Sequence, residues 1–181
     1  MTIEELVDEI VVDVPEAPIM AIRDAARWAQ REFCDGTNVW HIDSPVTVVD
    51  GVGSYEGIAD AEPVRVLSVS DGDRVLIPGT QYHQDDPQSL VFGIAVTNPV
   101  AVLVLRPSRG HDMPAPLIGH WREALIAGAC HRLLRMPQPW REMELSEYHR
   151  RRFMSLTADA LKTTALGYGK GGARVKLRRY H

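Results

Sequence analysis

The stretch Val46-Thr47-Val48-Val49-Asp50-Gly51-Val52-Gly53 decides the class of fold, because β-branched residues lead directly into a glycine-containing turn. Similar short segments recur up to residue 106, and Asp71-Gly72 is a strong hairpin signal between two of them. The segments expected to be strands are Val46–Val49, Tyr55–Ile58, Val64–Val69, Val75–Ile77, Ser89–Ile94 and Val100–Leu105. Because turns and not helices separate them, the sequence predicts a small antiparallel sheet of about six strands.

Helical periodicity flanks this region on both sides. Thr2 and Glu5 fit a capping box, and apolar residues recur at spacings of three and four after Pro18. Small residues from Ala124 to Cys130 would let another helix approach closely, and Gly167 is a plausible carboxy-terminal stop. The expected helices are Thr2–Val11, Ile19–Phe33, Leu117–Arg135 and Trp140–Leu166.

These patterns predict an α+β fold, with a helical bundle domain, an inserted small antiparallel β domain and an extended C-terminal arm. Residues 1–42 and 108–168 would form the helical domain, and residues 43–107 the inserted β domain. Residues 169–181 would form the flexible basic arm, in which a glycine-rich hinge precedes alternating basic and apolar residues. Such a segment can add a strand to the sheet edge of a partner.

The charge of the chain is unevenly distributed. The 181 residues carry a formal net charge of -4. Residues 1–113 hold 19 acidic and 7 basic residues, whereas residues 114–181 hold 5 acidic and 13 basic ones. The two parts therefore carry -12 and +8, which suits contact with another copy of the chain or with another charged surface.

Composition argues against several classes of protein. No apolar run approaches the roughly 18 residues of a membrane helix, and the acidic amino terminus does not resemble a secretory signal. We therefore expect a chain made in a reducing cytoplasm, with no membrane partner. Cys34 and Cys130 lie in apolar periodic segments, where buried free thiols are the commoner state.

Motifs for catalysis, cofactors and metals are weak. Gly167-Tyr168-Gly169-Lys170-Gly171-Gly172 follows a helix and lacks the hydroxyl of a phosphate-binding loop. The seven histidines form no close ligand pair on one helical face, and Cys130-His131 point in different directions. His111-Asp112 lies in a loop without a recognisable nucleophile. We expect no enzyme activity, no catalytic residues, no cofactor and no metal, with a small enzyme as the weakest remaining class.

Two groups of arginines are candidates for binding. Arg23, Arg27 and Arg31 form a stripe at spacing four, which is either a solvated face or a subunit contact. Arg150, Arg151 and Arg152 lie on the last helix, where they would contact nucleic acid or form an ion-pairing seam between subunits. We assign all six to a subunit interface. The alternative is a nucleic-acid-binding accessory protein that uses the basic C-terminal helix and the arm.

Two segments together resemble a known family. The first is Ala25-Ala26-Arg27-Trp28-Ala29-Gln30-Arg31-Glu32-Phe33-Cys34, followed by Trp40. The second is Pro139-Trp140, followed by Tyr148-His149-Arg150-Arg151-Arg152-Phe153 and small residues up to Leu166-Gly167. Both are similar to helices of tailed-bacteriophage head-to-tail adaptor proteins, also called connector or neck proteins. The β insertion resembles the tubular adaptors of short-tailed phages more than the smaller helical ones.

The resemblance implies a structural virion protein, assembled in the host cytoplasm and located in the neck. About twelve copies would form a ring that joins the portal vertex of the capsid to the tail. The portal protein and tail or neck proteins would be its partners, and DNA would be passing cargo. By position, the portal-docking residues would be Lys170, Arg174, Val175, Lys176, Leu177, Arg178, Arg179 and Tyr180.

Overall fold

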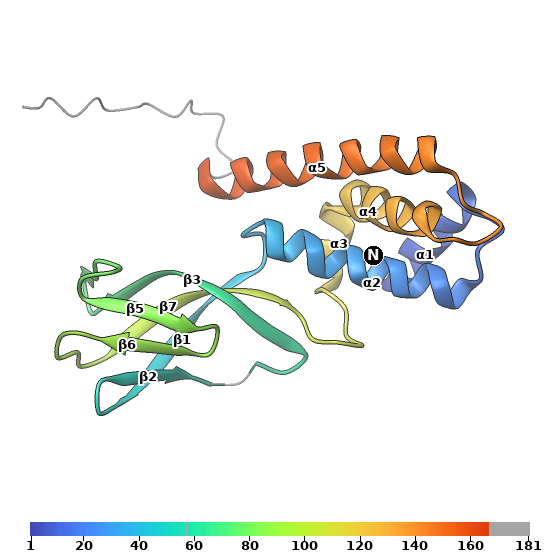
Figure 1. Cartoon of the computed structure of the whole chain (residues 1–181). Coiled ribbons are helices and arrows are strands. Elements are labelled where there is room, and N and C mark those ends of the chain that lie inside the picture. Colours follow the sequence, from blue (N-terminus) through green and yellow to red (C-terminus); the bar gives the residue numbers. More distant parts are fainter. Residues whose placement is uncertain (57, 167–181) are drawn as a thin grey trace, which may run out of the picture.

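A computed structural model describes residues 1–56 and 58–166 of the chain (Figure 1). Two helices precede the strands, and three follow them. The elements are α1 (Ile3–Asp13), α2 (Ile19–Gly36), β1 (His41–Val49), β2 (Val52–Tyr55), β3 (Ala61–Asp71), β4 (Arg74–Val75), β5 (Tyr82–Asp86), β6 (Ser89–Phe92), β7 (Pro99–Pro107), α3 (Ala115–His120), α4 (Arg122–Arg135) and α5 (Met143–Leu166).

The seven strands form one antiparallel sheet in the order β4-β3-β7-β1-β2-β6-β5, curved into a half-barrel. Strand β1 changes partner along its length. His41 to Pro45 pair with β7, whereas Val46 to Val49 pair with β2. The register of the β3–β7 pair shifts at two points, and such irregularities increase the local bend and twist of a strand.

Turn residues fix the register of the first hairpin. Asp50 and Gly51 both have positive φ, at 50° and 80°, which is the conformation of a two-residue hairpin turn. This turn, predicted from the sequence, is confirmed. Gly53 follows it in β2, where a Cβ atom would lie only 2.6 Å from both the Phe92 ring and Val46 Cγ1. A glycine is therefore needed for the sheet to close over its own core.

The open side of the half-barrel is bridged by a side chain. Gln84 of β5 accepts a hydrogen bond from the Val66 backbone amide of β3, at 3.0 Å. Strand β5 ends the hydrogen-bonded order and β3 is second from its other end, so this contact links the two sides of the sheet. The apolar core of the sheet lies inside the curve and includes Leu90, Leu103 and Leu105, all with no exposed surface.

The helices pack into a separate apolar cluster. Helix α4 lies between α2 and α5 (Figure 1). Gly128 makes this close packing possible, because a Cβ at its position would lie 3.0 Å from both Ala29 of α2 and Phe153 of α5. The small-residue segment predicted to permit close helix packing is confirmed. The predicted capping box is also confirmed, since Thr2 and Glu5 exchange hydrogen bonds of 2.7 and 3.3 Å.

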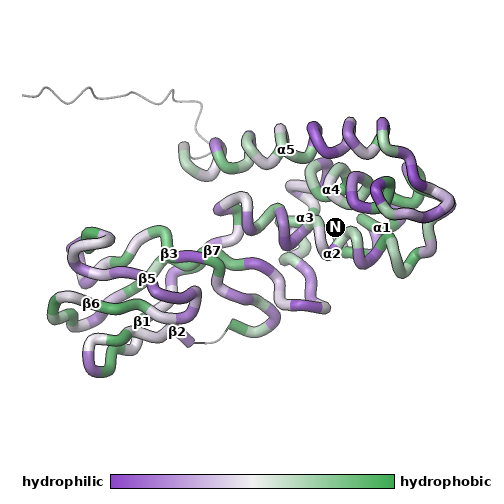
Figure 2. Tube along the Cα trace, in the orientation of Figure 1, coloured by the Kyte–Doolittle hydropathy of each residue, from purple (hydrophilic) through white to green (hydrophobic). Residues whose placement is uncertain are grey.

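The predicted fold class is wrong. Instead of a helical bundle with a small β insertion, the described chain contains a seven-stranded half-barrel with its own core, and three of the five helices follow it in the chain. The sequence prediction missed β5, because His83, Gln84, Asp85 and Asp86 are polar and lie on an edge strand. Figure 2 shows this strand as hydrophilic next to the apolar β6.

The boundaries of the later helices also differ from the prediction. The helix expected over Leu117–Arg135 is divided at Trp121, whose φ of -106° and ψ of 18° separate α3 from α4. The last helix begins at Met143 and not near Trp140. No helix in residues 1–56 and 58–166 has both the length and the apolar character needed to cross a bilayer.

Candidate functional site

The middle of α2 directs two of the predicted interface arginines toward other parts of the same chain. Arg27 donates a hydrogen bond to Asp112, with 3.1 Å between Nε and Oδ1, and this bond raises the pKa of Arg27. Arg31 donates to the Pro107 carbonyl and pairs with Glu62 at 3.2 Å. These contacts account for Arg27 and Arg31 within one chain, and their role between subunits stays a prediction.

The end of α2 is joined to the sheet by two further arginines that sequence reasoning did not select. Arg106 of β7 contacts Asp35 at 2.9 Å and Glu62 at 3.1 Å. Burial alone would raise the pKa of Glu62, but hydrogen bonds from Arg31 and Arg106 outweigh it and lower that pKa. Arg65 donates a hydrogen bond of 2.9 Å to the backbone carbonyl of Asp35. We call Arg31, Asp35, Glu62, Arg65 and Arg106 the helix–sheet network.

Arg23 and the α5 arginines lie elsewhere. Arg23 is half-buried and faces Glu4 of α1 at 3.8 Å. Arg150 pairs with Glu147 on the same helix at 2.7 Å, and Arg152 pairs with Glu123 of α4 at 3.0 Å. Arg151 is exposed and has no ion pair with another described residue. The six predicted residues therefore do not converge on one surface.

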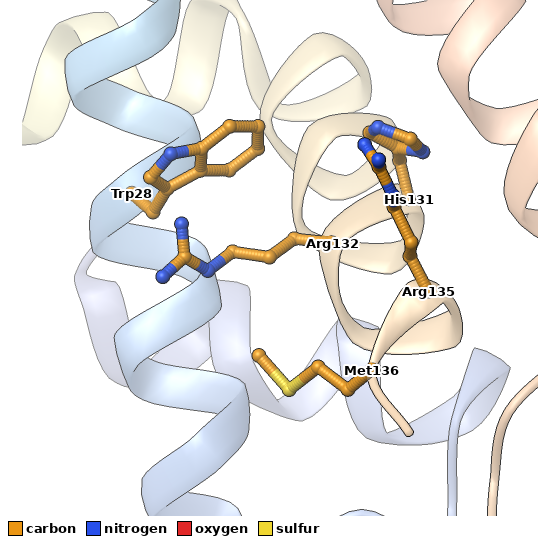
Figure 3. Close-up of a pocket in the computed structure, with 5 residues that line it drawn as sticks. All are labelled: Trp28, His131, Arg132, Arg135 and Met136. Carbon is orange, nitrogen blue, oxygen red and sulfur yellow. The ribbon is translucent and has the colours of Figure 1, made fainter. Parts of the chain in front are cut away.

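A groove of about 300 Å³ lies between α2 and α4. Figure 3 shows Trp28 of α2 on one side and His131, Arg132, Arg135 and Met136 of the α4 end on the other. The guanidinium carbon of Arg132 lies 4.9 Å from the centre of the Trp28 ring, which is a cation–π contact. The groove therefore combines an aromatic face with positive charge.

A second depression, of about 460 Å³, continues from the groove toward α5. His131 and Arg135 line both, and Met143, Ser146, Glu147 and Arg150 complete the second. Burial lowers the pKa of His131, and the charges of Arg135 and Arg150 lower it further. The positive charge of this surface at neutral pH therefore comes from the arginines.

An apolar stripe extends this surface along α5. Met143, Met154 and Leu161 are 50%, 56% and 42% exposed. They lie at spacings of eleven and seven, so they share one side of the helix, with the Arg150 guanidinium in contact with the sulfur of Met154. We call Arg132, Arg135, Met143, Arg150, Met154 and Leu161 the α4–α5 surface.

The sheet carries the opposite charge. Residues 43–107 contain nine acidic and three basic residues. Asp73, Asp85 and Asp86 are exposed in its turns and edge strand. Hydrogen bonds from Ser89 and the Gln88 backbone lower the pKa of Asp86, which keeps its carboxylate ionised. One chain therefore presents an acidic sheet and a basic, apolar helical surface.

The structure also brings together three possible metal ligands that the sequence search did not connect. Asp13, Cys130 and His149 place their ligand atoms within 4.8 Å of one another. Each comes from a different helix, α1, α4 or α5, so no local spacing could reveal the cluster. The expectation of no metal was based on residues close in sequence, such as the pair Cys130-His131. His131 is not part of the cluster, because its Nδ1 lies 3.1 Å from Ser146 Oγ.

Several sequence predictions lie outside the described residues. The glycine-rich segment from Gly167 and the whole predicted portal-docking arm, 169–181, belong to this group. His111 and Asp112 are described, but they contact different partners. His111 lies 2.9 Å from Asp60, whereas Asp112 binds Arg27.

Comparison with known proteins gave no match to a protein-family model and none to a curated protein. Function is therefore inferred from the surfaces of this chain. Among them, the α4–α5 surface has the composition most typical of a protein interface, because methionine, arginine and aromatic residues are enriched where proteins bind one another.

Proposed function

We propose that this chain is a structural subunit of a phage head-to-tail adaptor ring and that it has no enzymatic role. The observation that carries the proposal is the α4–α5 surface, where exposed Met143, Met154 and Leu161 adjoin an arginine-lined groove. Exposed apolar side chains of this size, gathered on one helix, favour contact with another protein over contact with water.

The charge distribution supports a ring. A closed ring of identical subunits needs two different and complementary patches on each copy. The α4–α5 surface provides a basic and apolar patch, and the exposed aspartates of the sheet provide an acidic one. We propose that the acidic sheet of one subunit lies near the α4–α5 surface of its neighbour.

The remaining parts of the proposal follow from the resemblance of the α2 and α5 segments to adaptor proteins. The ring would have about twelve copies and would lie in the virion neck between the portal protein and the tail or neck proteins. DNA would pass through its lumen. Residues 169–181 would dock on the portal, which leaves the α4–α5 surface available for contacts between adaptor subunits.

Electron microscopy of portal rings from the same phage, mixed with the full-length chain, tests this function. We expect added ring-shaped density at the narrow end of the portal. Deletion of residues 169–181 should remove that density and leave the helical circular dichroism of the chain unchanged. A full-length chain that does not bind the portal would contradict the adaptor function.

The contribution of the α4–α5 surface has its own test. Met154→Glu combined with Leu161→Glu places two charges on the apolar stripe, and we expect ring formation on the portal to be lost. Both side chains are largely exposed, so the subunit should still fold. Met20→Glu on α2 is a matched control, because Met20 is 64% exposed and lies outside both the α4–α5 surface and the acidic sheet. Equal loss of rings in both variants would argue against the assignment.

The DNA-binding alternative uses Arg150, Arg151, Arg152 and the C-terminal arm, and a titration with labelled duplex DNA distinguishes it from the adaptor function. A nucleic-acid-binding protein would bind the duplex with an affinity that falls steeply as salt rises. We expect the adaptor subunit to show no such binding at physiological ionic strength. Salt-dependent binding that is lost in Arg150→Ala and Arg151→Ala would favour the alternative.

A further inference from the structure

Three side chains from three helices meet where α1 ends. Asp13 is the last residue of α1, Cys130 lies on α4, and His149 lies on α5. Their oxygen, sulfur and nitrogen atoms all lie within 4.8 Å of one another, and the Cys130 Sγ is 3.7 Å from Asp13 Oδ2. The cluster has no part in the α4–α5 surface and none in the helix–sheet network.

One ring nitrogen of the imidazole in this cluster has no hydrogen-bond partner among the described residues. His149 is only 7% exposed, and its Nδ1 is buried without a hydrogen-bond partner among the described residues. A buried polar atom without a partner costs free energy, so such atoms are rare in folded proteins.

The other two residues complete a set of different donors. Cys130 has no exposed surface, whereas Asp13 is exposed to solvent. A thiolate, an imidazole nitrogen and a carboxylate oxygen are the three kinds of ligand that zinc takes from proteins. The thiolate and the carboxylate together would balance the double positive charge of the ion, leaving a neutral site in the apolar interior.

We propose that Asp13, Cys130 and His149 bind one zinc ion. The donor atoms of a tetrahedral zinc site lie roughly 3.3 to 3.8 Å apart, so small side-chain rotations would bring this cluster to binding distance. The fourth position would face the exposed side of Asp13 and would be filled by water. Binding transfers the proton of the Cys130 thiol to solvent and forms the sulfur–zinc bond with the resulting thiolate.

The consequence of zinc binding would be structural. The ion would join the end of α1 to α4 and α5, which are the helices that carry the α4–α5 surface. A ligand that binds the folded chain but not the unfolded chain stabilises the folded state. Zinc should therefore raise the melting temperature of the full chain. This inference is independent of the proposed adaptor function, because it concerns metal content and stability and not assembly.

The experiment uses the full-length chain, stripped with EDTA and dialysed. Titration with ZnCl2 in a calorimeter should show one site per chain, with release of a proton. Titration with CoCl2 should produce the near-ultraviolet absorption of a thiolate-to-cobalt bond. Cys34→Ser is the matched control, because Cys34 is also a buried free cysteine but has no place in the cluster, and it should leave both signals intact.

Each ligand variant should weaken zinc binding by about tenfold or more and reduce the cobalt signal. Asp13→Asn is the variant least able to disturb folding, since Asp13 is exposed, and Cys130→Ser removes the sulfur itself. Binding through exposed histidines such as His83 would give no thiolate absorption. A wild-type chain that binds no zinc at one equivalent, or a Cys130→Ser chain that keeps wild-type affinity, would overturn the proposal.

Discussion

His131 shows how one half-buried side chain can set the pH dependence of stability. Its Nδ1 lies 3.1 Å from Ser146 Oγ, and burial lowers its pKa, with further lowering by Arg135 and Arg150. A lowered folded-state pKa means that the unfolded chain binds a proton first as pH falls. The stabilising contribution is therefore present above the unfolded pKa of about 6.5 and is lost as pH falls through the folded pKa.

We predict that the free energy of unfolding decreases between pH 7.5 and pH 5.5, as measured by urea denaturation. His149 contributes in the same direction, because burial also lowers its pKa. His131→Asn keeps a polar group near Ser146 but does not titrate, so this variant should show a weaker pH dependence. A variant with the same pH dependence as the wild type would contradict the role assigned to His131.

At the scale of elements, the close packing of α2, α4 and α5 depends on a glycine, which has no side chain, at position 128. A Cβ atom at Gly128 of α4 would lie 3.0 Å from both the Cβ of Ala29 and the ring of Phe153. We predict that Gly128→Leu destabilises the chain by about 1 to 3 kcal/mol, because the packed helices have no room for the added atoms. Thermal unfolding followed by circular dichroism would measure the change.

The substitution Ala158→Leu on α5 provides the control for this prediction. Ala158 lies on the exposed side of α5, where added methyl groups meet solvent. It should change the melting temperature much less than Gly128→Leu. Equal destabilisation by the two substitutions would show that the cost does not come from the helix crossing.

The elements differ in how readily the sequence reveals them. The hairpin at Asp50-Gly51 is found because the turn needs residues that accept positive φ, which is a local requirement. Strand β5 is missed because an edge strand can be polar and still pair through its backbone. The contacts of Arg27 and Arg31, which lie 85 and 31 residues from Asp112 and Glu62, depend on the folded topology and not on local sequence.

At the scale of the whole molecule, the helix–sheet network joins two apolar cores. Arg106 contacts both Asp35 at the end of α2 and Glu62 of β3, and Trp40 packs against both cores. We predict that Arg65→Ala with Arg106→Ala lowers the free energy of unfolding by about 1 to 2 kcal/mol, allowing for the partial exposure of these groups. The sheet should then open more readily than the helices.

Two measurements separate these parts of the molecule. All four tryptophans pack against the helical core, so tryptophan fluorescence reports mainly on the helices. Amide hydrogen exchange of residues 61–107 reports on the sheet. We expect faster exchange in the sheet of the double variant and little change in Arg151→Ala. Unchanged exchange in the double variant would show that the network does not hold the sheet.

The position of the half-barrel between α2 and α3 in the chain determines the order in which the ribosome completes the two cores. All buried residues of the sheet core have been synthesised by residue 107, whereas Phe33 on α2 is covered only after Trp121 and Phe153 have emerged. The first two helices must therefore wait for more than half of the chain before their apolar faces are buried. Because such contacts between distant segments form slowly, nascent α2 is the segment most exposed to misassembly or chaperone binding during translation.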